Sequence, residues 1–240
     1  MTQNSMAKPS MAQPLFSLNM PGVDELFPGF APGDFAVIYG SPSIISLTSL
    51  LCIRAQLPPQ LGGLGSSVVF VDGGNTFRLY KIARLAQLHQ LNPHEVLGRI
   101  YISRAFTAYQ LTSLILDKLE ETVKAYNAKI VVISDIAGFF LTNDVPNEES
   151  QRVYSQIVSY LSSFAQKHQI VVIATYLPYA ESERNGLLQG VTCNKANTVI
   201  AFTKTANIKK IALQKHTSFS LGTAELPSEN PTLTDFMGAS

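Results

Sequence analysis

Short apolar runs rich in β-branched residues recur along this chain, and segments with helical spacing separate them. The clearest runs are residues 67–71 (SVVFV), 129–134 (KIVVIS) and 169–175 (QIVVIAT). Continuous apolar strands of this kind are typical of a parallel sheet that is covered on both faces. Strands that alternate with helices therefore predict an α/β domain with a mostly parallel β-sheet flanked by helices.

The pattern changes near the end of the domain. Residues 197–203 and 208–214 have the pattern of two strands with no helix between them, which predicts a C-terminal β-hairpin added to the sheet. We also expect Asn147 to cap the helix that it opens, because asparagine is a preferred N-cap residue. The other expected strands are 35–39 and 99–103, and the expected helices are 49–56, 76–90, 93–97, 107–126 and 147–168.

Length and composition predict one domain. The 240 residues are enough for a single α/β core, which we expect over residues 18–226, between a flexible leader (1–17) and a polar tail (227–240). No apolar run reaches the roughly 18 residues of a membrane span, and the leader lacks the apolar core of a signal peptide. Cys52 and Cys193 form no metal or disulfide pattern. We therefore expect no membrane association and a cytoplasmic location, or a nuclear one if the source is eukaryotic.

The segment from residue 35 to residue 56 has the strand–loop–helix setting of a phosphate-binding Walker A motif, G-x-x-x-x-G-K-[ST]. Counting from Gly40, the second glycine falls on Ile45, the lysine on Ser46 and the hydroxyl residue on Leu47. In such a loop the backbone N–H groups cradle phosphates, the lysine neutralises their charge and the hydroxyl holds Mg²⁺. Ser46 or Thr48 can supply a hydroxyl here, but a hydroxyl supplies no positive charge.

Three further stretches occur in order along the chain: residues 22–34 (GVDELFPGFAPGD), 71–78 (VDGGNTFR) and 91–106 (LNPHEVLGRIYISRAF). They resemble motifs of the RecA/RadA recombinase family, and their order and spacing make the resemblance specific. A fourth stretch, 131–140 (VVISDIAGFF), is similar to the family's Walker B strand. The resemblance runs from about Leu18 to Leu226 and implies a RecA-like fold and a role in homologous recombination and DNA repair.

The departures from the family pattern fall on its catalytic positions. The general-base glutamate corresponds to Gly74, and the Walker B carboxylate to Asp135, although a slip of one residue would put Ser134 there. Hydrolysis without both lysine and glutamate is not expected, because each such group contributes orders of magnitude in rate. Asp72 is interpreted as a residue that caps the following turn, in preference to a metal ligand. The vestigial nucleotide site is predicted to consist of Gly40, Ser46, Thr48 and Asp135, with no ATP–Mg²⁺ cofactor and no metal.

The family's two DNA-binding loops correspond to residues 141–149 and 176–195. The first is acidic, whereas the interval from Arg184 to Ala224 holds six Lys or Arg and no Asp or Glu. Aromatic and basic side chains together can stack bases and neutralise phosphates. The alternative is that the tyrosines pack on the domain and the lysines protect strand edges from pairing. The candidate DNA-binding residues are Tyr176, Tyr179, Arg184, Lys195, Lys204, Lys209, Lys210 and Lys215.

Three functions remain open from the sequence. The first is a non-catalytic recombinase paralogue that binds single- or double-stranded DNA, or a RecA/RadA-type recombinase or paralogue subunit, as an accessory or regulatory factor. The second is a residual ATP-binding protein in which a lysine from elsewhere replaces the missing charge. The third is a structural or regulatory protein-binding module with no DNA role, since fold alone does not determine function.

Overall fold

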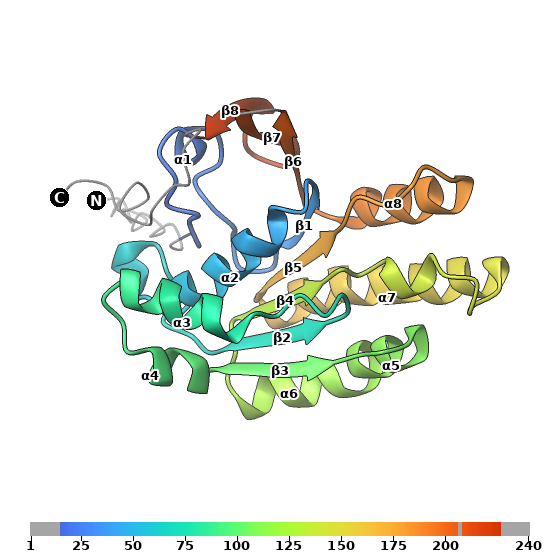
Figure 1. Cartoon of the computed structure of the whole chain (residues 1–240), viewed down its shortest axis with the longest axis horizontal. Coiled ribbons are helices and arrows are strands. Elements are labelled where there is room, and N and C mark those ends of the chain that lie inside the picture. The colour runs from blue at the N-terminus through green and yellow to red at the C-terminus, as the bar shows by residue number, and fades with distance from the viewer. Residues whose placement is uncertain (1–14, 206–207, 227–240) are drawn as a thin grey trace, which may run out of the picture.

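The computed structural model describes residues 15–205 and 208–226. In these residues an eight-stranded sheet runs through the molecule with the strand order β3-β2-β4-β5-β1-β6-β7-β8 (Figure 1). All pairs from β3 to β6 are parallel, and β7 and β8 are antiparallel to their neighbours. The α/β architecture with a mostly parallel sheet is therefore confirmed. The strands are β1 (Phe35–Gly40), β2 (Val68–Asp72), β3 (Ile100–Arg104), β4 (Ile130–Ser134), β5 (Val171–Tyr176), β6 (Thr198–Thr205), β7 (Ile208–Lys215) and β8 (Gly222–Leu226).

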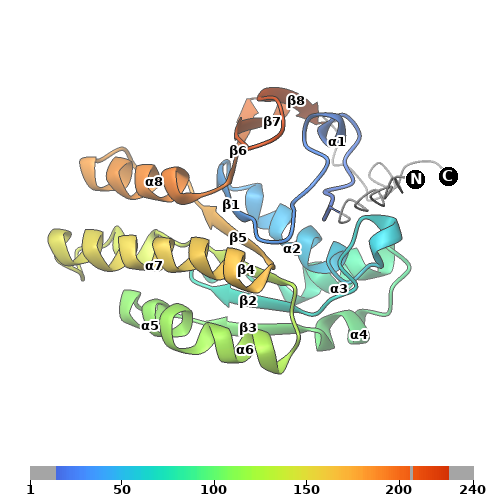
Figure 2. The ribbon, with the colours of Figure 1, turned by 180° about the vertical axis from the view of Figure 1, so that it is seen from behind.

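Helices cover both faces of the parallel part of the sheet (Figures 1 and 2). One face carries α2 (Ile44–Arg54), α3 (Leu79–Leu88) and α4 (Pro93–Gly98). The other face carries α5 (Ala108–Ser113), α6 (Leu119–Ala125), α7 (Asn147–His168) and α8 (Glu183–Lys195). The short helix α1 (Val23–Leu26) packs against β8, and Pro59–Leu61 and Gly138–Phe140 form single 3₁₀ turns.

Two apolar layers make up the core, one on each face of the sheet. In β4, for example, Ile130 and Val132 belong to the layer under α2, whereas Val131 and Ile133 belong to the layer under α7. Successive side chains of a strand point to opposite faces, so a strand that is covered on both faces must be apolar throughout. This requirement explains why the strands are continuous apolar runs in the sequence.

Several helix boundaries differ from the expected ones. Helix α2 begins at Ile44 and not at residue 49, and α3 begins at Leu79 because residues 73–78 form a turn. The expected helix 107–126 contains a π-helical turn, Leu114–Lys118, between α5 and α6. Helix α7 has the expected bounds, but Pro146 is its N-cap residue and no side chain caps it, so the expected cap by Asn147 was wrong.

The C-terminal part contains two elements that were not expected. Helix α8 occupies most of the predicted loop 176–195, and the Ser182 hydroxyl caps it by accepting from the Asn185 N–H. Gly186 and Gly190 lie within α8, and glycine lowers helix propensity, which explains why the sequence pattern did not indicate a helix. The expected hairpin of β6 and β7 is present, and β8 extends it by a third antiparallel strand.

Part of the predicted domain organisation lies outside the described residues. This applies to the tail, 227–240, and to residues 1–14 of the leader. Within the described ranges, no helix has the length and apolar character that crossing a membrane requires.

Candidate functional site at the carboxyl edge of the sheet

The carboxyl ends of the parallel strands meet at one edge of the sheet, where β1 ends at Gly40, β2 at Asp72 and β4 at Ser134. Helix α2 leaves β1 on one face, whereas α7 and α8 leave β4 and β5 on the other face (Figure 1). In open α/β sheets, ligands bind outside the carboxyl ends of the strands where the connections change face. This edge is therefore the candidate functional site.

The backbone N–H groups of the loop after β1 are engaged in hydrogen bonds, both within the loop and with β6. The N–H of Ser41 donates to the Phe202 carbonyl at 2.7 Å, and that of Ser46 donates to the Ser43 carbonyl at 2.9 Å. The N–H groups of Ile44 and Ile45 are likewise bound to carbonyls within the loop. A phosphate cradle needs such groups free to point at the ligand. In this conformation these four donors are engaged elsewhere.

Gly40 is required for a reason that does not involve phosphate. Its φ is 112°, a conformation that L side chains rarely adopt, and a Cβ atom here would lie 2.3 Å from the Phe202 carbonyl oxygen. Glycine therefore allows the close approach of the loop to β6.

The two hydroxyl candidates of the loop have different environments. Thr48 is buried, and its hydroxyl donates to the Ile45 carbonyl at 2.9 Å. Ser46 is exposed, and its hydroxyl accepts a hydrogen bond from the ammonium group of Lys81. Lys81 belongs to the first turn of α3, and partial burial lowers its pKa. A lysine thus lies beside the position where the Walker A motif has its own lysine. Lys81 is 35 positions away from Ser46 in the sequence, and no local sequence pattern indicated that the two residues would be in contact.

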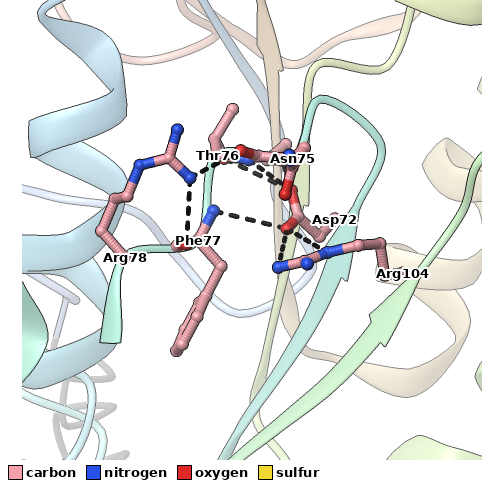
Figure 3. Close-up of polar contacts among 7 residues, drawn as sticks. Asp72, Asn75, Thr76, Phe77, Arg78 and Arg104 are labelled. Carbon is pink, nitrogen blue, oxygen red and sulfur yellow. Dashed lines mark hydrogen bonds and ion pairs between the residues drawn. The ribbon is translucent and has the colours of Figure 1, made fainter. Parts of the chain in front are cut away.

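Asp72 is the centre of a buried polar cluster at the end of β2 (Figure 3). Its Oδ1 atom accepts from the Thr76 N–H at 2.8 Å and from the Ser134 hydroxyl at 2.9 Å. Its Oδ2 atom accepts from the Phe77 N–H at 3.3 Å and forms an ion pair with Arg104, with both contacts to the guanidinium at 3.0 Å. These contacts agree with the interpretation of Asp72 as a turn-capping residue.

The described residues contain no group of three or more His, Cys, Asp or Glu that could hold a metal ion. Both oxygens of Asp72 already accept at least two hydrogen bonds, so this carboxylate has little capacity left for a further ligand.

Ser134, and not Asp135, faces helix α2. Ser134 ends β4 directly opposite Asp72 in the strand register, on the same side of the strand as Ile130 and Val132. Asp135 follows with a φ of 52°, and its carboxylate accepts a hydrogen bond from the Tyr179 hydroxyl. Burial raises the pKa of Asp135. The structure therefore brings Asp135 together with Tyr179, which follows β5.

The turn after β2 leaves no space for an acidic side chain at position 74. A Cβ atom on Gly74 would lie 2.6 Å from the Cβ atom of Asp135, and one on Gly73 would lie 2.8 Å from the Ser134 carbonyl oxygen. Real Cβ atoms do not approach other atoms this closely. The two glycines are required where the family pattern has its general-base glutamate.

The aromatic candidates for DNA stacking are engaged inside the domain. Tyr176 is only 2% exposed, and its hydroxyl donates to the Asn185 side chain at 2.6 Å. The Tyr179 ring is half-buried and its hydroxyl is bound to Asp135. Base stacking needs an accessible ring face, so the burial of Tyr176 contradicts the stacking role considered for it.

The basic candidates do not form one continuous surface. The Arg184 guanidinium donates to the Val145 carbonyl at 2.9 Å, and the Lys215 ammonium donates to the Asn194 carbonyl at 2.8 Å, at the end of α8. Lys210 forms an ion pair with Glu225 at 2.8 Å. Lys204 and Lys209 are opposite each other in the β6–β7 register, on the α2 face of the sheet, whereas Lys195 ends α8 on the other face.

Carboxylates surround the starts of α7 and α8. The contact of Arg184 with Val145 brings the two segments together. All of these acidic side chains are at least partly exposed, so this part of the edge is poorly suited to phosphate contact. They are Asp144, Glu148, Glu149, Glu181 and Glu183.

A comparison with protein families matches residues 26–215 to the family model described as Rad51. The matched range includes all strands from β1 to β7 and the whole carboxyl edge described above.

Proposed function

Because the chain belongs to the Rad51 family, we propose that it is a non-catalytic member that acts as an accessory factor in DNA recombination and repair. The family indicates a recombinase-like role in these processes. The proposal that the protein is non-catalytic depends mainly on the loop 41–46. The N–H groups of Ser41, Ile44, Ile45 and Ser46 in this loop already donate to carbonyls of the domain. Since a phosphate would have to displace these bonds, the folded loop offers no ready cradle for ATP.

Two further features support the absence of hydrolysis. Ile45 and Ser46 stand where the motif has its second glycine and its lysine, and the turn at Gly74 excludes a glutamate side chain. Phosphoryl transfer depends on positioned charges around the phosphates and the attacking water. A site without the motif's own lysine and the glutamate is therefore not expected to stabilise the transition state.

Residual nucleotide binding is the second candidate, and one contact favours it. The Lys81 ammonium lies against Ser46, close to the place that a phosphate-binding lysine would occupy. In this arrangement the lysine already has a hydrogen-bond partner, and a nucleotide would have to compete both with that partner and with the closed loop.

The proposed partners of the protein are single- or double-stranded DNA and a recombinase or paralogue subunit of the same family. Lys204, Lys209 and Lys195 are the remaining candidates for phosphate contact. The core is held by two buried apolar layers, so the domain can present binding surfaces without a nucleotide.

Thermal unfolding and phosphate release, each measured with and without ATP–Mg²⁺, test the proposal that the protein neither binds nor hydrolyses ATP. We expect no nucleotide-dependent change in the melting temperature and no phosphate release, because a ligand stabilises a protein only in proportion to its binding. A clear stabilisation that disappears in Lys81→Ala would instead establish residual nucleotide binding.

Fluorescence anisotropy with labelled DNA at several salt concentrations tests the proposal that the protein binds DNA. We expect ATP-independent binding that weakens as salt rises, as phosphate contacts require. Complete absence of binding at low salt would contradict the DNA role and would leave a protein-binding module as the better account.

A further inference from the structure

The solvent side of helix α3 carries positive charge that no nearby acid balances in the sequence. Residues 73–94 contain Arg78, Lys81 and Arg84 and no Asp or Glu. At about 100° per residue, Tyr80, Lys81 and Arg84 project away from the buried side of the helix. That buried side is formed by Ile82 and Ala86. We call Arg78, Tyr80, Lys81 and Arg84 the α3 surface.

Tyr80 is a large aromatic side chain of this surface that lies almost entirely in solvent. Its exposed fraction is 87%, and Arg84, also exposed, lies one helical turn away. Residues at this spacing are neighbours on a helix, so the Arg84 charge and the exposed Tyr80 ring lie on the same side of α3. An aromatic ring that is almost fully in water contributes nothing to the core.

Among residues 15–205 and 208–226, no ion pair joins a carboxylate to the α3 surface. Helix α2 lies beside it and contributes the uncharged Ser46, which Lys81 contacts. Asp72 is buried and already paired with Arg104. Glu95 belongs to α4, which follows the far end of α3, and its carboxylate accepts from Asn92.

Charge is therefore distributed unequally between the two faces of the sheet. The carboxylates at the starts of α7 and α8 lie on the opposite face from α3 (Figures 1 and 2). A polyanion that approaches the carboxyl edge meets favourable potential on the α3 side and unfavourable potential on the other.

We propose that the α3 surface binds single-stranded DNA. The cations of Arg78, Lys81 and Arg84 contact backbone phosphates, and one base stacks on the ring of Tyr80. This combination of a basic surface and a free aromatic ring is the one that binds single strands without sequence preference. The inference rests on the DNA role proposed above. It places the DNA on the face of the sheet that carries α3, and not on the opposite face, where Lys195 ends α8.

The experiment is an anisotropy titration of a fluorescent oligothymidine with the full chain at several salt concentrations. We expect Tyr80→Ala to weaken binding at least about fivefold through the loss of stacking, and Tyr80→Phe to bind like the wild type. Arg84→Gln is expected to weaken binding and to reduce the slope of log affinity against log salt by about 0.7. Because both side chains are exposed, these variants are expected to fold, which circular dichroism checks.

Two controls separate this inference from the proposed function. Lys118→Gln removes an exposed charge on the opposite face and is expected to leave binding unchanged. If the wild type binds and only Lys204→Gln/Lys209→Gln weakens it, the α3 proposal is overturned while the DNA role stands. If Arg84→Gln weakens binding but Tyr80→Ala does not, base stacking is overturned. If the wild type itself does not bind at low salt, both the inference and the DNA role fail.

Discussion

At the scale of single residues, Asp72 connects three parts of the chain through one carboxyl group. It holds the turn at Thr76 and Phe77, pairs with Arg104 at the end of β3 and accepts from Ser134 at the end of β4. A buried carboxylate is stable only when its lone pairs are satisfied. The cluster therefore depends on each of its donors.

Removal of the Arg104 side chain is expected to destabilise the fold by about 2–3 kcal/mol, because the buried Asp72 loses its ion-pair partner. The Arg104 side chain is 37% exposed, which keeps the expected loss below that of a fully buried pair. Urea unfolding of Arg104→Ala measures it. Arg152→Ala, which removes an exposed arginine of α7, is the matched control and is expected to change stability by less than about 0.5 kcal/mol.

A second prediction concerns the family's glutamate position. Gly74→Glu is expected to lower stability by about 1–3 kcal/mol, as overpacking does, because the new Cβ atom meets Asp135 at 2.6 Å. No ATP hydrolysis is expected even in combination with Ser46→Lys. Phosphate release above the background in this double variant would show that the loop opens for nucleotide.

A third prediction concerns His89, whose Nε2 atom is buried without a hydrogen-bond partner. Burial lowers its pKa from 6.5 to about 4, with a smaller contribution from Arg54. Between these two values the unfolded chain binds a proton that the folded protein excludes, so stability falls as the pH drops from 6.5 to about 4.

At pH 5 we expect His89 to cost at most about 2 kcal/mol of stability, the value that the whole pKa shift would give. The free energy of unfolding of wild type and of His89→Leu, measured by urea unfolding at pH 7 and pH 5, isolates the contribution of His89. The difference in stability between the two proteins should shift in favour of the variant at the lower pH. An equal response of both proteins would contradict the prediction.

At the scale of secondary structure, helix α8 depends on its ends more than on its interior. Ser182 caps the start, the Lys215 ammonium binds carbonyls at the end, and Gly186 and Gly190 weaken the middle. Loss of the cap in Ser182→Ala is expected to cost about 1 kcal/mol and to speed hydrogen exchange in α8. Ser163→Ala, at an exposed position inside α7, is the control and should leave exchange in α8 unchanged.

The elements also show what could be predicted from the sequence. Strands such as β4 and β5 were predicted nearly to the residue, because burial on both faces leaves an unmistakable apolar run. Helix α8 was not predicted, because its stability comes from tertiary contacts and caps that local composition does not reveal. The contact of Lys81 with Ser46 was likewise beyond local patterns, since it depends on how α2 and α3 pack.

At the scale of the whole molecule, the sheet separates an acidic side from a basic side at its carboxyl edge. Neutralisation of the acidic side is expected to raise the affinity for DNA at low salt, because like charge in the path of a phosphate backbone is unfavourable. The double variant Glu148→Gln/Glu181→Gln is expected to bind a few-fold more tightly in anisotropy titrations. This gain should vanish at high salt, where screening removes it, and a gain that persists would contradict an electrostatic origin.

The closed loop after β1 has a consequence for how such a protein leaves its partners. If this loop binds no nucleotide, as proposed above, its state does not change with nucleotide binding or hydrolysis. Each association with a partner is then an equilibrium that concentration and affinity alone determine, because no ATP hydrolysis drives dissociation. A cell that needs to end the association must do so by competition, dilution or destruction of one partner.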